Sequence, residues 1–163
     1  MKKITVLLAD DNRDVRRKFR ELLEFDCDFE IVGEARNEQK AVSMVKKFCP
    51  AFVLMDISMP PLNGFHATRE ILKDSPATKV LMLSAHSEDA YVEEAMNSGA
   101  MGYLVKQTCV DSLCSAIREV QKGNTFFSPS IPGRIPNGIR DWINGSPYPS
   151  PNQPTLKSQN SNI

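Results

Sequence analysis

The sequence predicts an α/β fold: a doubly wound, parallel five-stranded sheet with five helices, in the flavodoxin-like strand order 2-1-3-4-5. Two features predict it. Short apolar runs recur along residues 4–105, and longer stretches with helical periodicity separate them. Several runs are continuously apolar, as strands buried on both faces of a parallel sheet are. Right-handed crossovers then place helices on both faces of the sheet.

The apolar runs give the predicted strands in chain order. They are Ile4–Ala9, Phe29–Ala35, Ala51–Met55, Lys79–Leu83 and Met101–Val105. Their lengths are typical of strands in globular proteins.

Three of the intervening stretches show an apolar helix face. The first has apolar residues at i, i+4, i+7 and i+8, which are Val15, Phe19, Leu22 and Leu23. Similar spacings recur in the second and the last, at Ala41, Met44, Val45, Phe48, Leu113, Ile117 and Val120. Such spacing is typical of an amphipathic helix packed on a core.

Capping signals support the helix starts. Asp11 or Asn12 is placed to cap the first helix. Ser87, ahead of acidic residues, is predicted to cap the fourth helix. Thr108, with Asp111 three residues later, resembles a capping box for the fifth helix.

The composition changes near residue 127. Seven of the 11 prolines of this 163-residue chain lie in residues 128–163, which are also rich in serine and asparagine. That stretch holds three of the 20 basic and one of the 20 acidic residues, so residues 1–127 carry a net charge of −2. We therefore predict one domain over 1–127 and a flexible tail over 128–163, with no recognisable output domain.

The same arithmetic excludes several protein classes. A net charge of zero gives no sign of a large basic surface for nucleic acid. No apolar run approaches the roughly 20 residues that span a bilayer. The four cysteines form no Cys-x-x-Cys pair, so a zinc site or a disulfide framework is not expected. We expect a cytoplasmic protein without membrane contact.

Polar residues follow every predicted strand, and those after the first, third, fourth and fifth strands are the candidates for a site, since the second strand is expected at the edge of the sheet. In such folds the ligand site lies at the carboxyl ends of the strands, near the topological switch point. The residues at those ends are Asp10, Asp11, Asp56, Ser84 and Lys106. Each alone has an ordinary explanation as a helix cap or a surface residue, but their joint placement predicts a site.

The residue types in this set indicate phosphoryl transfer to a carboxylate. Three converging carboxylates repel one another, and hard oxygen ligands with room for water suit Mg²⁺. Asp10 and Asp11 are the better metal ligands, and Asp56, alone after a buried run, is the better nucleophile. Lys106 supplies a point charge and Ser84 a hydroxyl for phosphate oxygens.

These residues carry a resemblance to a known family. Asp10-Asp11, the segments 55–60 and 102–106, Gly64 and Ser84-Ala85 resemble the receiver domain of bacterial two-component response regulators over about residues 4–127. The stretches 98–103 and 113–123 are similar to the NarL/LuxR class. Asn63 departs from the Asp that many relatives carry before the glycine, which should leave the chemistry intact.

The resemblance implies a role for each residue. Asp56 would accept phosphate from the phosphohistidine of a sensor kinase or a phosphotransfer protein. Asp10, Asp11, Asp56 and the main-chain carbonyl of Ser58 would hold Mg²⁺. Lys106 and Ser84 would contact the phosphate, and Tyr103 would rotate inward as a switch.

The function implied is control of a protein–protein interface by phosphorylation, upstream of a transcriptional output domain that we do not find in this chain. It includes no catalysis beyond the chain's own phosphorylation and dephosphorylation. A phosphorylation-dependent homodimer is compatible with it, whereas direct DNA binding by this chain is not expected. The alternatives are a stand-alone receiver that serves as a relay intermediate or docking module, and an aspartate-nucleophile phosphatase. The phosphatase reading is weakened because Asn12 stands where those enzymes place a second acid.

Overall fold

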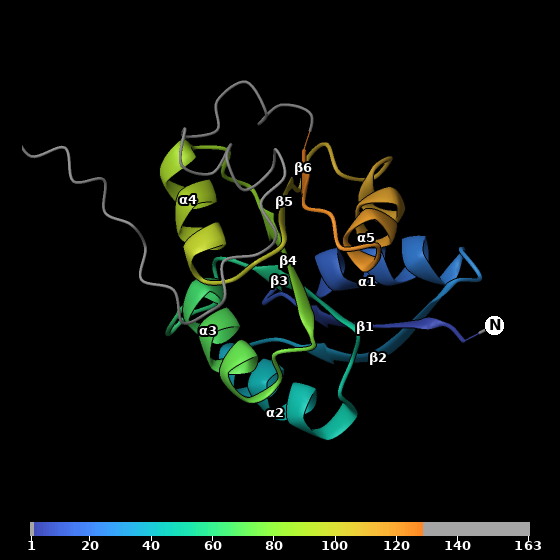
Figure 1. Cartoon of the computed structure of the whole chain (residues 1–163), viewed down its shortest axis with the longest axis horizontal. Coiled ribbons are helices and arrows are strands. Elements are labelled where there is room, and N and C mark those ends of the chain that lie inside the picture. Colours follow the sequence, from blue (N-terminus) through green and yellow to red (C-terminus); the bar gives the residue numbers. More distant parts are fainter. Residues whose placement is uncertain (1, 129–163) are drawn as a thin grey trace, which may run out of the picture.

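A parallel sheet of six strands forms the centre of the protein in the computed structural model, which describes residues 2–128 (Figure 1). The order is β2-β1-β3-β4-β5-β6, which confirms the predicted order 2-1-3-4-5. The sheet has six strands and not the predicted five, because the short strand β6 was not predicted. The strands are β1 (Ile4–Ala9), β2 (Phe29–Ala35), β3 (Phe52–Asp56), β4 (Lys79–Ser84), β5 (Gly102–Val105) and β6 (Phe126–Phe127).

Five helices cover the two faces of the sheet. They are α1 (Arg13–Glu24), α2 (Glu38–Phe48), α3 (Gly64–Asp74), α4 (Asp89–Asn97) and α5 (Leu113–Gln121). α1 and α5 lie on one face, and α2, α3 and α4 lie on the other (Figure 1). Within residues 2–128, none of these helices is both long and apolar enough to cross a membrane.

Each face of the sheet has its own apolar core. Along the buried strand β3, Val53 and Met55 pack in the cluster with α2, α3 and α4. Phe52 and Leu54 pack in the cluster with α1 and α5. Alternate side chains of a strand point to opposite faces, so a strand covered on both faces must be apolar throughout. This is the physical reason for the continuous runs in the sequence.

Asparagine side chains cap three helices at the edge of the sheet where the strands end. Asn12 accepts from the N–H groups of Asp14 and Val15, which settles the choice between Asp11 and Asn12. Asn37 and Asn63 cap α2 and α3 in the same way. Each cap satisfies N–H groups that the first helical turn leaves unpaired.

Two predicted caps are wrong. The residue before α4 is Glu88 and not Ser87, and it makes no side-chain capping bond. α5 begins only at Leu113, so Thr108 caps nothing. The N–H of Thr108 donates to the Val105 carbonyl at 3.1 Å, which closes a turn after β5 and delays the helix.

The added strand β6 pairs in parallel with β5 at the edge of the sheet. Ser128, directly after β6, is fully buried. Its N–H donates to the Tyr103 carbonyl at 2.9 Å, and its hydroxyl accepts from the Val105 N–H at 2.7 Å. The packed structure thus includes Ser128, one residue past the predicted boundary. The rest of the predicted tail, 129–163, lies outside the described residues.

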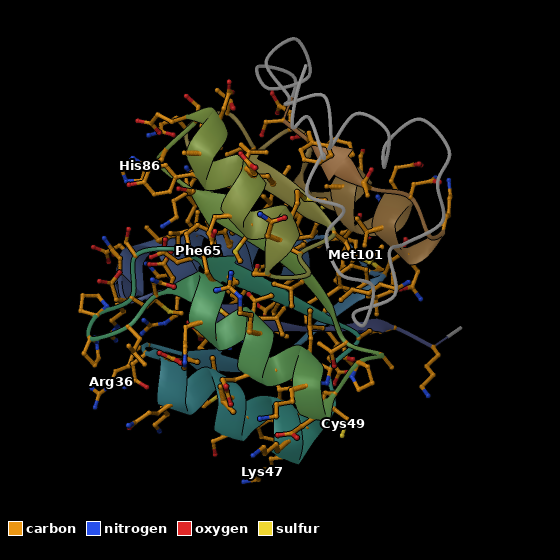
Figure 2. The ribbon with its side chains drawn as sticks, turned by 60° about the vertical axis from the view of Figure 1, so that its left-hand side comes forward. Arg36, Lys47, Cys49, Phe65, His86 and Met101 are labelled. Carbon is orange, nitrogen blue, oxygen red and sulfur yellow. The ribbon has the colours of Figure 1, made fainter. Side chains whose placement is uncertain are left out.

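Cys49 ends α2 in the left-handed conformation, with φ of 46° (Figure 2). A side chain at this position brings Cβ close to the main chain, which costs about 1–2 kcal/mol. The thiol is exposed, and the conformation is the one that glycine adopts at helix ends.

We predict that Cys49→Gly raises the free energy of unfolding by about 0.5–1 kcal/mol, because glycine removes this strain. Urea denaturation followed by circular dichroism measures the change. Cys27→Gly is the matched control, since Cys27 is also exposed and does not have a positive φ. An equal gain in both variants would refute the explanation by backbone strain.

Candidate functional site

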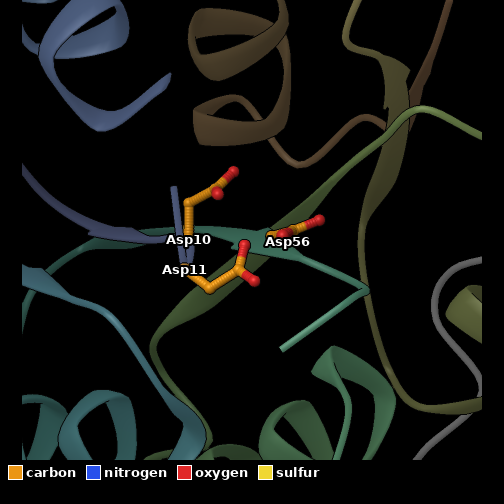
Figure 3. Close-up of side chains that lie close together, drawn as sticks. All are labelled: Asp10, Asp11 and Asp56. Carbon is orange, nitrogen blue, oxygen red and sulfur yellow. The ribbon is translucent and has the colours of Figure 1, made fainter. Parts of the chain in front are cut away.

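Three carboxylates meet at the carboxyl ends of the neighbouring strands β1 and β3 (Figure 3). Asp10 and Asp11 directly follow β1, and Asp56 is the last residue of β3. One ligand atom from each residue lies within 4.8 Å of those of the other two. Asp10 and Asp56 are buried, whereas Asp11 is exposed. The structure therefore brings together the three acids that the sequence singled out.

Lys106 lies among these acids from the end of β5. Its Nζ donates to Asp10 Oδ2 at 2.6 Å and lies 3.2 Å from Asp56 Oδ1. The main-chain N–H of Lys106 donates to the Ser84 carbonyl at 2.8 Å, which extends the pairing of β4 with β5. One ammonium group thus faces two of the three carboxylates.

The charge state of Asp56 depends on this balance. Burial and the negative charge of Asp10 raise the pKa of Asp56 to about 6, against the opposing effect of Lys106. Burial lowers the pKa of Lys106, but the hydrogen bond to Asp10 and the charge of Asp56 outweigh it, so that pKa is raised. With a pKa of about 6, Asp56 is mostly ionised at neutral pH, and it shares the single ammonium group of Lys106 with Asp10.

The arrangement fits a divalent cation. Burial, and then the charge of Asp10, disfavour the ionised form of Asp56 and raise its pKa, so a cation beside it would be favourable. Three carboxylate oxygens close together form the kind of hard, partly solvated ligand set that Mg²⁺ takes with additional water or phosphate oxygens. The residues at the strand ends could therefore hold Mg²⁺.

The loop between β3 and α3 packs tightly under Asp56. A Cβ placed on Gly64 would lie 2.2 Å from the Asp56 carbonyl oxygen, so no other residue fits there without moving the main chain. The Gly64 N–H donates to the Ile57 carbonyl at 2.8 Å, and the Ser58 N–H donates to Asp56 Oδ1 at 3.3 Å. These contacts hold the main chain around the Asp56 carboxylate, and the metal contact predicted for the Ser58 carbonyl stays a prediction.

Ser84 and Tyr103 lie close to the site on the neighbouring strands β4 and β5. Both are buried, and the Ser84 hydroxyl accepts from the His86 N–H at 3.0 Å. The Tyr103 hydroxyl donates to the His86 carbonyl at 2.7 Å. Burial raises the pKa of Tyr103 to about 12. The family resemblance implies that the Tyr103 ring rotates inward when the protein is switched. In this structure the ring is already buried.

The His86 side chain lies beside α4 (Figure 2). Its ring stacks on Tyr91 with the centroids 4.5 Å apart. His86 therefore contributes to the site through its main chain.

Sequence reasoning missed one residue that contacts the site. Arg16, on α1, donates through Nη1 to the main-chain carbonyl of Asp10 at 2.7 Å. Its side chain is only 14% exposed. Nothing in the local pattern distinguishes it from the neighbouring Arg13, Arg17 and Arg20, because the carbonyl that it contacts is a main-chain group.

Comparisons with known proteins identify relatives of this chain. Residues 6–118 match the family described as response regulator receiver domain. The chain is 34% identical over 142 residues to the transcriptional regulatory protein DegU of Brevibacillus brevis, covering 87% of this chain and 60% of DegU. It is 33% identical over 137 residues to the response regulator protein VraR of Staphylococcus aureus, covering 84% and 66%.

Solved structures give the same result. A two-component response regulator of the LuxR family from Aurantimonas sp. superimposes with a TM-score of 0.79 at 28% identity, covering 87% of this chain and 99% of that one. The receiver domain of the putative response regulator NarL from Mycobacterium tuberculosis gives 0.73 at 29%, covering 76% and 100%. The chain spans about 60–66% of the length of the curated relatives described above.

We predict that Asp56→Asn stabilises the fold at pH 7.5 by about 2 kcal/mol when no divalent cation is present. The pKa of Asp56 is about 6 in the fold, against 3.8 in the unfolded chain. Ionisation therefore destabilises the fold progressively as the pH rises from about 4 to about 6. Asparagine has nearly the same shape and no charge, so the difference between the two proteins grows over that range and then stays constant.

Urea denaturation between pH 4.5 and 7.5 measures this difference. Asp74→Asn is the control, because Asp74 is exposed and forms only a surface ion pair with Lys46. Its effect should stay within about 0.5 kcal/mol. A variant Asp56→Asn that is less stable than the unsubstituted protein at pH 7.5 would contradict the electrostatic account.

Proposed function

The chain belongs to the response regulator receiver family, with relatives of the NarL/LuxR class, and from this membership we propose that Asp56 accepts a phosphoryl group from a sensor histidine kinase or a phosphotransfer protein. One observation carries the proposal. Lys106 Nζ faces both Asp10 and Asp56 in a cluster of three carboxylates at the ends of the strands.

In the proposed reaction a carboxylate oxygen of Asp56 attacks the phosphorus of the donor. The new O–P bond forms as the P–N bond to the donor imidazole breaks, and the electron pair leaves with the imidazole nitrogen. The attacking carboxylate must be ionised, and a pKa of about 6 leaves it mostly ionised at neutral pH. Lys106, which contacts Asp56 before the reaction, is close enough to contact the phosphoryl oxygens afterwards.

Asp10, Asp11, Asp56 and the Ser58 carbonyl are the proposed ligands of Mg²⁺. The bound cation would neutralise the charge that the carboxylates and the phosphoryl group bring together. The buried Asp10 also accepts from Lys106 and from the Asn12 N–H at 2.8 Å, so its carboxylate is held in place. Asp11 is exposed and has room to adjust to the cation.

Phosphorylation is then proposed to alter the surface around β5. The Ser84 hydroxyl, next to Asp56 across the sheet, would move to the phosphoryl group and release the His86 N–H that it now accepts from. The Tyr103 hydroxyl donates to the carbonyl of the same His86. The main chain of His86 therefore links the two switch residues. A shift of Ser84 would move His86 and with it the partner of Tyr103, and the phosphoryl group would favour this shifted state.

The proposed protein is a cytoplasmic switch and catalyses only its own phosphorylation and dephosphorylation. Control of transcription, which the name of the relative DegU states, is proposed for the whole protein through an output domain. The domain limits 1–127 and 128–163 stay a proposal, with the packed part extended to Ser128. A stand-alone relay intermediate is the alternative, and the same site serves both functions.

We predict that acetyl phosphate and Mg²⁺ add one phosphoryl group to the protein, because the acids and Lys106 form the complete acceptor site. Asp56→Asn should abolish the labelling, and Lys106→Met should reduce it at least tenfold by removing the ammonium group from the phosphoryl oxygens. Intact-protein mass spectrometry measures the product.

Asp74→Asn is the matched control for labelling, since it removes an exposed carboxylate far from the strand ends. It should be labelled at the rate of the unsubstituted protein. Full labelling of Asp56→Asn would refute the assignment of the acceptor.

We also predict that the phosphate mimic beryllofluoride converts the 18.2 kDa chain into a homodimer. The mimic occupies the acceptor site and should favour the state with the altered β5 surface. Size-exclusion chromatography with light scattering measures the mass, with Asp56→Asn plus beryllofluoride as the control. An unchanged mass in the unsubstituted protein would rule out dimerisation as the response.

A further inference from the structure

Arg16 supports the candidate metal ligands from outside the predicted set. It lies in the first turn of α1, directly after the loop that carries Asp10 and Asp11. Its Nη1 donates to the main-chain carbonyl of Asp10 at 2.7 Å, and its Nε donates to Glu34 Oε1 on β2 at 3.2 Å. A charged donor at this short distance makes a strong hydrogen bond. The guanidinium group thus joins β2 to the main chain at the candidate site.

Besides the bond that Asp10 Oδ2 accepts from Lys106, three hydrogen bonds of Asp10 hold the turn between β1 and α1. The Asp10 N–H donates to the Ala35 carbonyl at 3.0 Å, and the Asn12 N–H donates to Asp10 Oδ1 at 2.8 Å. The third bond is the one from Arg16 to the Asp10 carbonyl. It is the only one of the three made by a side chain that is neither a candidate ligand nor the helix cap, so it can be removed without removing a ligand.

We propose that Arg16 is a positioning residue for the metal ligands, and that it places the Asp11 carboxylate by fixing the peptide between Asp10 and Asp11. A peptide group is planar, so its carbonyl oxygen and the next Cα move together. Holding the Asp10 carbonyl oxygen therefore fixes the position of the Asp11 Cα, from which the carboxylate side chain extends. Asp11 is exposed, and its carboxylate forms no hydrogen bond or ion pair with a side chain of residues 2–128, so its position depends on its main chain. This inference rests on the proposed function, which makes Asp11 a ligand.

The fork of the arginine side chain is needed for this role. Arg16 contacts the Asp10 carbonyl and the Glu34 carboxylate at the same time, from two different nitrogens. A lysine ammonium is a compact point charge and does not reproduce this planar, two-way contact. Arg16→Lys should therefore keep the charge and lose part of the positioning.

Arg20 offers a matched control one turn further along α1. It also bonds Glu34, through Nε at 2.9 Å and Nη2 at 2.8 Å, but its other partner is Glu24. Arg20→Met thus removes an arginine of the same helix that bonds the same carboxylate. It leaves the contact between Arg16 and the Asp10 carbonyl in place. Comparing it with Arg16→Met separates the contact to Asp10 from the general loss of ion pairs with Glu34.

The experiment measures binding of Mn²⁺, a probe for Mg²⁺ with the same preference for oxygen ligands. The electron paramagnetic resonance signal of free Mn²⁺ is followed in a titration of the full chain, without any phosphodonor. Arg16→Met should weaken Mn²⁺ binding about tenfold, the usual effect of removing a group that orients a ligand. Arg16→Lys should weaken it less, and Arg20→Met should stay within about twofold.

A second measurement separates positioning from a general structural defect. The rate of labelling by acetyl phosphate in Arg16→Met should recover when Mg²⁺ is saturating, because the acceptor Asp56 is untouched. A rate that stays low at saturating Mg²⁺ would overturn the inference. Thermal unfolding of each variant without metal gives the fraction of protein that is folded at the assay temperature. The measured Mn²⁺ affinity is corrected for this fraction.

The outcomes distinguish this inference from the proposed function. Unchanged Mn²⁺ binding in Arg16→Met, or an equal loss in Arg20→Met, would overturn the role of Arg16 and leave the metal site standing. No Mn²⁺ binding by the unsubstituted chain would overturn the metal site, and the role of Arg16 with it.

Discussion

Repulsion between Asp10 and Asp56 is the constraint on which the arrangement of the site depends. Two neighbouring parallel strands end in buried carboxylates, and burial makes that repulsion stronger than it would be in water. Lys106 offsets part of it from β5. Burial and the remaining repulsion from Asp10 raise the pKa of Asp56 to about 6, and the site is left with an affinity for positive charge. The energy that destabilises these acids in the free protein is thus available for binding a cation.

The fold maintains this unfavourable arrangement because its loops are short and fixed at both ends. Each of the strands β1, β2 and β3 is followed by a helix whose first turn is capped by an asparagine. Gly64 adds a close contact with the Asp56 carbonyl oxygen that no larger residue permits. Well-capped helices and a tightly packed loop give the carboxylates little freedom to separate, so the repulsion is not relieved by movement.

Much of this arrangement could be predicted from the sequence. Continuous apolar runs identified the strands, since β3 is buried on both faces, and the polar residues after them identified Asp10, Asp56 and Lys106. The predictions failed where the deciding partner is a main-chain group or a short edge contact. Thr108 bonds the Val105 carbonyl and forms a turn where a helix cap was expected. β6 is only two residues long, and Arg16 contacts a carbonyl, so neither produces a pattern of side chains.

The parallel pairing of β6 with β5 also determines where the described part of the chain ends. All six strands run in the same direction, so Ser128, which follows β6, lies toward the carboxyl ends of the strands, where it bonds Tyr103 and Val105 of β5. A fused protein attached after Ser128 therefore starts next to β5 at the edge of the sheet, with β4 and β5 between it and Asp56. For the design of fusion reporters, a short linker at this point would place a fluorophore next to β5, the strand that carries Tyr103.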